Sequence, residues 1–101
     1  IAQLIMMAGY SNRSAAYEDS IVRAMQQYKL GGVVFFQGGP VRQARLTNRL
    51  QAVSKVPLMI AMDAEWGIAM RLDSTVRYPY QMTLGGMGAA NDTLIYQMGR
   101  Q

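Results

Sequence analysis

Apolar residues gather in three short unbroken runs along the chain: residues 4–8, 33–36 and 58–62. None of the runs alternates with polar residues, which is typical of parallel strands that are buried on both faces. Between the first two runs, Tyr17, Ile21 and Met25 recur at the spacing of one helical face, and they predict a helix over residues 15–28. The chain therefore begins as a strand, a helix and a second strand.

A second helix is predicted over residues 40–54, between the second and third runs. Leu46, Leu50 and Val53 form one apolar stripe at helical spacing. Pro40 suits the first turn of this helix, because a proline there has no intrahelical hydrogen bond to lose. The third strand then follows, which extends the pattern to β-α-β-α-β.

The remaining boundaries are indicated by charged residues and glycines. Glu18 and Asp19 fall in the first turn of the first helix, where the helix dipole favours negative charge. Gly31-Gly32 is predicted to end this helix, since glycine readily adopts the left-handed conformation of a C-terminal cap. A loop is predicted over residues 67–87, followed by a helix that begins near Asn91-Asp92.

This order of elements places the chain in the α/β class, with a parallel sheet that is either open and doubly wound or part of a closed barrel. The chain ends at Arg100-Gln101 within a predicted helix, with no cap and no further strand. A (β/α)8 barrel needs eight strands and about 250 residues. We therefore expect the chain to be an incomplete fragment, with the first three βα units of such a barrel.

The composition excludes several kinds of chemistry. The chain has no cysteine and no histidine, which removes disulfides, thiolate and imidazole metal ligands, and imidazole bases. The net charge is +4, but the basic residues form no run, and Arg42, Arg45 and Arg49 share one solvated side of the second helix. We therefore expect no nucleic-acid partner. No apolar run approaches the roughly 20 residues that span a membrane. We also expect that the protein holds no metal and no other cofactor.

Candidate binding residues follow the third predicted strand. In parallel α/β folds, functional side chains gather where the strands end. Asp63 and Glu65 come directly after the run at 58–62, and carboxylates accept strong hydrogen bonds from sugar hydroxyls. Trp66 offers a ring face on which a sugar would stack, and Arg71 follows in the same loop. Structural alternatives stay open: Asp63 would cap the loop or pair with Arg71, and Trp66 would only cover the rim of a barrel.

Four segments carry a resemblance to a known family: GGVVFF at 31–36, VPLMIAMDAEWG at 56–67 with MRL at 70–72, YP at 78–79 with MTLG at 82–85, and QLIM at 3–6. They resemble, in turn, the second βα unit, the Asp-x-Glu-x-Gly segment after the third strand, the segment before the third helix, and the first strand of glycoside hydrolase family 3. The resemblance covers nearly the whole chain. It implies that residues 1–101 are the N-terminal portion of a truncated catalytic (β/α)8 barrel.

The segment Asp63-Ala64-Glu65-Trp66-Gly67 is most similar to the bacterial β-N-acetylhexosaminidase branch of this family. This similarity implies a retaining, exo-acting enzyme that removes terminal β-linked N-acetylglucosamine, with Asp63 binding hydroxyls of the sugar at the non-reducing end. It also implies a location in the bacterial periplasm or cell envelope. Trp66 departs from the glycine that is commoner at this place in the family.

The residues that perform the family's chemistry are expected outside this chain. By resemblance they comprise an aspartate nucleophile, a histidine paired with an aspartate, and a Lys-His motif that grips the substrate. The chain has no histidine, and Lys29 and Lys55 lie outside such a motif. Asp63 and Glu65 are therefore not expected to be the catalytic carboxylate pair, and the isolated chain is expected to be inactive.

Other interpretations of the sequence stay open. A β-glucosidase of the same family would share the aspartate after the third strand. A non-catalytic α/β sugar-binding module would end naturally near Gln101 and fold cooperatively alone. A nucleotide-binding domain is disfavoured, because neither a G-x-G-x-x-G segment nor a P-loop follows any of the strands. The expected macromolecular partner is the remainder of the chain's own barrel, since free strand edges pair with other chains.

Overall fold

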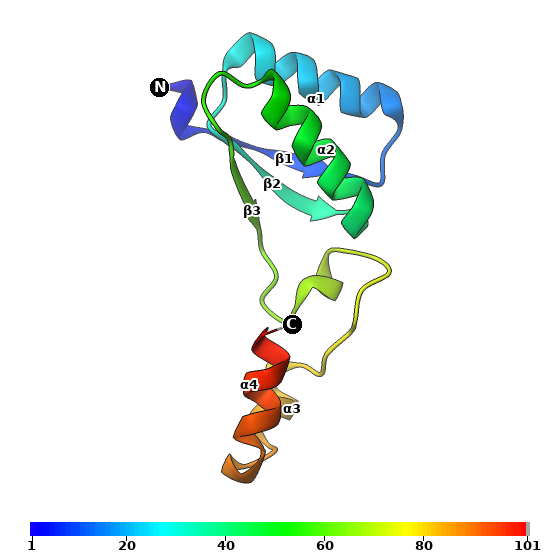
Figure 1. Cartoon of the computed structure of the whole chain (residues 1–101), viewed down its shortest axis with the longest axis vertical. Coiled ribbons are helices and arrows are strands. Elements are labelled where there is room, and N and C mark those ends of the chain that lie inside the picture. Colours follow the sequence, from blue (N-terminus) through cyan, green and yellow to red (C-terminus); the bar gives the residue numbers. More distant parts are fainter. Residues whose placement is uncertain (101) are drawn as a thin grey trace.

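The computed structural model describes residues 1–100, which form a small parallel sheet with two long helices beside it and a helical C-terminal segment (Figure 1). The strands and α-helices are β1 (Met6–Tyr10), α1 (Ala15–Tyr28), β2 (Gly32–Gln37), α2 (Pro40–Val53), β3 (Met59–Met62), α3 (Gln81–Gly85) and α4 (Asp92–Arg100). Single 3-10 turns occupy Ala2–Leu4, Ile68–Met70 and Ala89–Asn91. Gln101, which was predicted to continue the last helix, lies outside the described residues.

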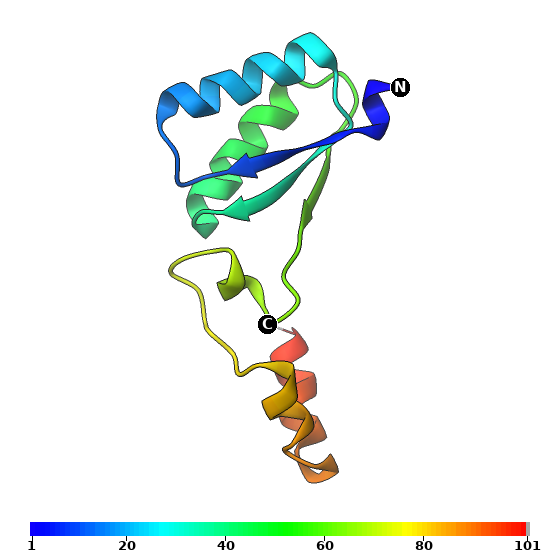
Figure 2. The same ribbon diagram turned by 180° about the vertical axis from the view of Figure 1, so that it is seen from behind.

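The three strands lie in chain order and all run parallel, with Gly32 of β2 opposite Met6 of β1 and Met59 of β3. Both α1 and α2 cover the same face of this sheet (Figures 1 and 2). The connection from one parallel strand to the next is right-handed. Two connecting helices therefore lie on the same face of the sheet only when successive strands are added in the same direction across it. The wall of a barrel has this arrangement, and so does one half of a doubly wound sheet. The predicted α/β class is confirmed by the strands and helices, and the βα units of a (β/α)8 barrel are confirmed by the family of the chain, which is given with the site below.

The core lies between the sheet and the two helices. Val33 and Phe35 of β2 are completely buried, and they belong to one apolar cluster with Ile21 of α1 and with Leu46 and Leu50 of α2. These helix residues recur at the spacing of one helical face, so each helix buries one stripe against the sheet. The core therefore uses the residues that the helical periodicity identified.

The opposite face of the sheet is left open within residues 1–100. Successive side chains of a strand point to opposite faces, so Val34 and Phe36 point away from the helices that bury Val33 and Phe35. Met59 at the start of β3 is 68% exposed. A face of apolar residues that no element covers is what the inner wall of an unclosed barrel presents.

The first strand begins later than predicted. The run at 4–8 was expected to be the strand, but Ala2–Leu4 form a 3-10 turn and β1 continues through Gly9 to Tyr10. A β-carbon on Gly9 would lie 2.5 Å from Cγ1 of Val33. Gly9 therefore lets β1 lie close beneath the side chains of β2.

The cap at the end of α1 also differs from the prediction. Lys29, and not Gly31-Gly32, adopts the left-handed conformation, with φ 52° and ψ 49°. The two glycines are required for close packing, because a β-carbon would lie 1.9 Å from the Gln3 carbonyl oxygen at Gly31 and 2.3 Å from the Met59 carbonyl oxygen at Gly32. The second helix agrees with the prediction to within one residue, ending at Val53.

The C-terminal segment lies away from the sheet (Figure 1). The predicted loop over 67–87 contains the turn Ile68–Met70 and the short helix α3, and α4 begins at Asp92 as predicted. The radius of gyration is 16.6 Å, against about 13 Å for a compact domain of this length. Leu94 and Tyr96 of α4 are more than half exposed, so the last helix has an apolar surface that the sheet does not cover.

Candidate functional site

The candidate site lies at the carboxyl edge of the sheet, which is the edge where β1, β2 and β3 end. Because the strands are parallel, Tyr10, Gln37 and Met62 end at this same edge. Ligands in parallel α/β folds bind at the carboxyl ends of the strands. Asp63 is the first residue after β3 and therefore stands at this edge.

Arg71 is joined to Asp63 by two hydrogen bonds. Its Nε donates to the main-chain carbonyl oxygen of Asp63 at 2.8 Å, and its Nη2 donates to the carboxylate Oδ2 at 3.1 Å. The Arg71 side chain is 16% exposed, whereas the Asp63 side chain is 53% exposed. The guanidinium thus orients a carboxylate that still has room to accept hydrogen bonds from a ligand.

Two aromatic rings lie beside this ion pair. The guanidinium of Arg71 lies over the ring of Phe36 at 5.1 Å from its centroid, and Phe36 stacks on Tyr10 with centroids 5.9 Å apart and planes inclined by 24°. Tyr10 and Phe36 were missed by the sequence analysis. Each stands at one of the last two positions of its strand, and an aromatic residue there is the signal that would have identified them.

The loop that carries Arg71 is attached to the end of β2. The Gly38 amide donates to the carbonyl oxygen of Arg71 at 3.1 Å, and the Asp73 amide donates to the carbonyl oxygen of Gly38 at 2.8 Å. Gly38 and Leu72 thereby form one parallel bridge. The backbone from which the Arg71 side chain projects is held by the sheet itself.

Ser11 supports the same junction from the end of β1. Its side chain is buried, its Oγ accepts a hydrogen bond from the Gly39 amide at 3.3 Å, and its carbonyl oxygen accepts one from Nε of Arg42 at 3.1 Å. Arg42 also forms an ion pair with Asp73. A β-carbon on Gly38 would lie 1.7 Å from Oγ of Ser11, so the chain after β1 and the chain after β2 approach too closely for any residue but glycine to fit at Gly38 unchanged.

The Trp66 ring and the main chain of Glu65 contact a different group of neighbours. The ring of Trp66 meets Tyr80 edge-on, with centroids 5.0 Å apart, and lies under the guanidinium of Arg77 at 5.7 Å. The carbonyl oxygen of Glu65 accepts a hydrogen bond from the side chain of Gln81. Trp66 also lines a pocket of about 470 Å³ beside α3 and the end of α4. Asp63 and Arg71 therefore form one unit, and the other two predicted residues adjoin it along the loop.

Burial and charge shift the pKa of two groups. Burial, together with the neighbouring Tyr10, raises the pKa of the Tyr17 hydroxyl. A hydrogen bond from Arg49 and its positive charge lower the pKa of Asp19, on the helix side of the sheet. Residues 1–100 contain no group of three or more carboxylate, imidazole or thiol ligands that could hold a metal ion.

The fold and the site define a class of protein: the opening βα units of a (β/α)8 barrel, with polar residues at the carboxyl edge. Within that class, the whole chain, residues 1–101, matches the family described as Glycosyl hydrolase family 3 N terminal domain, and the chain belongs to this family. It is thus part of a glycosidase family, as the four sequence segments indicated. A comparison with curated proteins found no match. In the part of the chain that the structure describes, no helix has both the length and the apolar character to cross a membrane.

Proposed function

We propose that residues 1–101 form the truncated N-terminal portion of the catalytic barrel of a retaining, exo-acting β-glycosidase. We further propose that this enzyme is a β-N-acetylhexosaminidase that removes terminal N-acetylglucosamine. Family membership supports the reaction class. The observation that carries the proposal is the Asp63 carboxylate at the carboxyl edge, because it stays 53% exposed even though it forms the pairing with Arg71 that the sequence analysis gave as its structural alternative.

In this proposal, Asp63 binds the hydroxyl groups of the terminal sugar. A carboxylate accepts hydrogen bonds from hydroxyls, and a charged acceptor makes them stronger than a neutral one does. The guanidinium of Arg71 has five N–H groups, of which two donate to Asp63 and hold it in place. Glu65 and Trp66 follow Asp63 in the same loop, and we assign them to the outer part of the substrate site.

The bond-breaking groups lie outside this chain in the proposed enzyme. A retaining glycosidase needs a nucleophile and a separate acid and base, placed on either side of the glycosidic bond. The chain contains no histidine to serve as the acid and base. The contribution of these residues is therefore to hold and orient the sugar while groups elsewhere in the barrel react.

The test is an assay of the full-length protein on an aryl β-N-acetylglucosaminide and on the matching aryl β-glucoside. We expect turnover of the first, and we expect Asp63→Asn to lower kcat/KM by about 10- to 100-fold, as the loss of a charged hydrogen bond does. Asp19→Asn is the matched control, because Asp19 also pairs with an arginine and has a side chain that is 47% exposed, but lies on the helix side.

The outcomes separate the proposals. Preferred turnover of the glucoside would replace the N-acetylhexosaminidase by a β-glucosidase of the same family. Binding of either sugar without turnover would indicate a non-catalytic sugar-binding module. Equal activity of Asp63→Asn and Asp19→Asn would remove Asp63 from the substrate site.

A further inference from the structure

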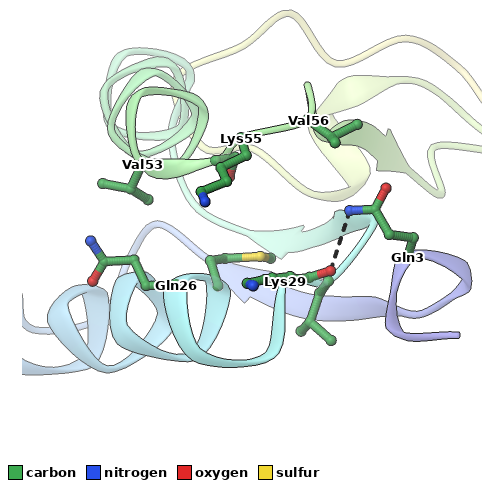
Figure 3. A pocket seen from close by; sticks show the side chains of 9 residues that line it. Gln3, Gln26, Lys29, Val53, Lys55 and Val56 are labelled. Carbon is green, nitrogen blue, oxygen red and sulfur yellow. Dashed lines mark hydrogen bonds between the residues drawn. The ribbon is translucent and has the colours of Figure 1, made fainter.

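A second pocket lies at the opposite end of the sheet from the carboxyl edge, between the C-terminal ends of α1 and α2 (Figure 3). Its volume of about 510 Å³ is within the range of roughly 300–1,000 Å³ that small-molecule sites occupy. Because it lies between two helices on the outer face of the sheet, strands added to either edge of the sheet would not cover it.

The pocket combines an apolar lining with positive charge. Met25, Leu30 and Val53 contribute apolar side chains, and the only two lysines of the chain, Lys29 and Lys55, also line it. Figure 3 shows the Lys55 nitrogen in the gap between the two helices and the Lys29 side chain along the end of α1. Both lysines of the 101-residue chain thus border this pocket.

Within residues 1–100, no carboxylate neutralises the positive charge of the pocket. No aspartate or glutamate lines the pocket, and within residues 1–100 neither lysine forms an ion pair. Four of the carboxylates are paired elsewhere, all with arginines: Glu18, Asp19, Asp63 and Asp73. The C-terminal ends of two helices carry about half a negative charge each, which offsets about one of the two ammonium charges and leaves the pocket positive.

The backbone of Lys29 gives independent support for a role of its side chain. Lys29 adopts φ 52°, a conformation that is unfavourable for a residue with a β-carbon and that glycine adopts without strain. Its carbonyl oxygen also accepts a hydrogen bond from Nε2 of Gln3 at 3.3 Å, which ties the N-terminal turn to the pocket. The chain therefore keeps a lysine side chain at a place where glycine would be the more stable choice.

We propose that this pocket binds a small organic anion. Its carboxylate or phosphate head lies between the ammonium groups of Lys29 and Lys55, and its apolar body packs against Met25, Leu30 and Val53. The site is separate from the sugar site at the carboxyl edge, and it requires no bond-breaking chemistry.

The test is a calorimetric titration of the full-length protein with octanoate and octyl phosphate as anions with an apolar body. Octanamide supplies the same body without charge, and inorganic phosphate supplies charge without the body. We expect both anions to bind at least about tenfold more tightly than either partial ligand, since a single charge contact is worth roughly a factor of ten. Saturable binding of only one of the two anions would show whether the pocket accepts a carboxylate or a phosphate head group. Equal binding of octanamide and octanoate would overturn the proposal.

Variants separate binding from folding. Lys29→Gln with Lys55→Gln should weaken octanoate binding by about tenfold or more, whereas Arg23→Gln with Arg45→Gln removes the same charge outside the pocket and should leave it unchanged. Lys29→Gly should weaken binding while it keeps or raises the thermal midpoint, because glycine suits the left-handed backbone. Retained affinity in Lys29→Gly and in the double lysine variant would overturn the proposal.

Discussion

The guanidinium of Arg71 holds Asp63 at two points, the main-chain carbonyl oxygen and the carboxylate, at 2.8 Å and 3.1 Å. Arg71 is itself placed by the sheet, since its carbonyl oxygen accepts a hydrogen bond from the Gly38 amide. The orientation of the proposed sugar-binding carboxylate is thus determined by the end of a neighbouring strand.

Replacing Arg71 should disturb sugar binding more than it disturbs folding. In the full-length protein, Arg71→Lys keeps a positive charge but loses the fork that reaches both oxygens of Asp63, and we expect KM for the aryl N-acetylglucosaminide to rise by about 10-fold. Arg71→Gln should raise it further. Steady-state kinetics would measure the change, with Arg45→Gln as the control, and an unchanged KM in both Arg71 variants would contradict the assigned role.

Adding a methyl group at Gly38 should destabilise the protein. Its β-carbon would lie 1.7 Å from Oγ of Ser11, so Ser11 or the loop at Arg71 must move, and overpacking of this kind costs about 1–3 kcal/mol. Urea unfolding of the full-length protein would report the loss as a lower midpoint. Gly85→Ala is the control, because no atom lies within 4 Å of a β-carbon there. A midpoint unchanged by Gly38→Ala would show that the junction is not tightly packed.

The ion pair of Asp19 should make stability depend on pH in the acid range. Its hydrogen bond and attraction to Arg49 lower the pKa of Asp19 below the ordinary value of 3.8. A carboxyl with a depressed pKa in the folded state stabilises the protein above the pKa of the unfolded state, and this contribution is lost as pH falls through the folded-state pKa. The difference in urea midpoint between the native protein and Asp19→Asn should therefore be present at neutral pH and vanish in strong acid. A difference that grows on acidification would have the wrong sign.

The isolated 101-residue chain should neither hydrolyse an aryl β-N-acetylglucosaminide nor remain a monomer. It lacks the histidine of the expected catalytic pair, and its sheet has an uncovered apolar face with Met59 68% exposed. Light scattering should show association through this face and the free strand edges. Met59→Lys should reduce association, whereas Met82→Lys, which changes an exposed residue outside the sheet, should not. Turnover by the pure chain, or a monomer with one sharp thermal transition, would count against the truncated-barrel proposal.

Much of the fold was predictable because its information is local. The spacing of Tyr17, Ile21 and Met25 located α1 at its observed bounds, and Leu46 with Leu50 located α2 to within one residue. Helical periodicity depends on residues three or four positions apart, so it can be recognised without knowledge of the rest of the chain. The position of Asp63 directly after a buried strand likewise identified the carboxyl edge.

The tertiary structure decided what depends on residues that are distant in the chain. It placed the left-handed cap at Lys29 because Gly31 and Gly32 are needed beside other backbone atoms, and it joined Phe36 to Tyr10 across two strands. It also placed both helices on one face of the sheet and brought both lysines to one pocket. The sequence by itself determined the elements and the family segments, because these depend on composition and short spacing. Only folding determined which side chains meet. The distance between two backbones, and the face of the sheet to which each side chain points, are set by contacts between residues that are distant in the chain.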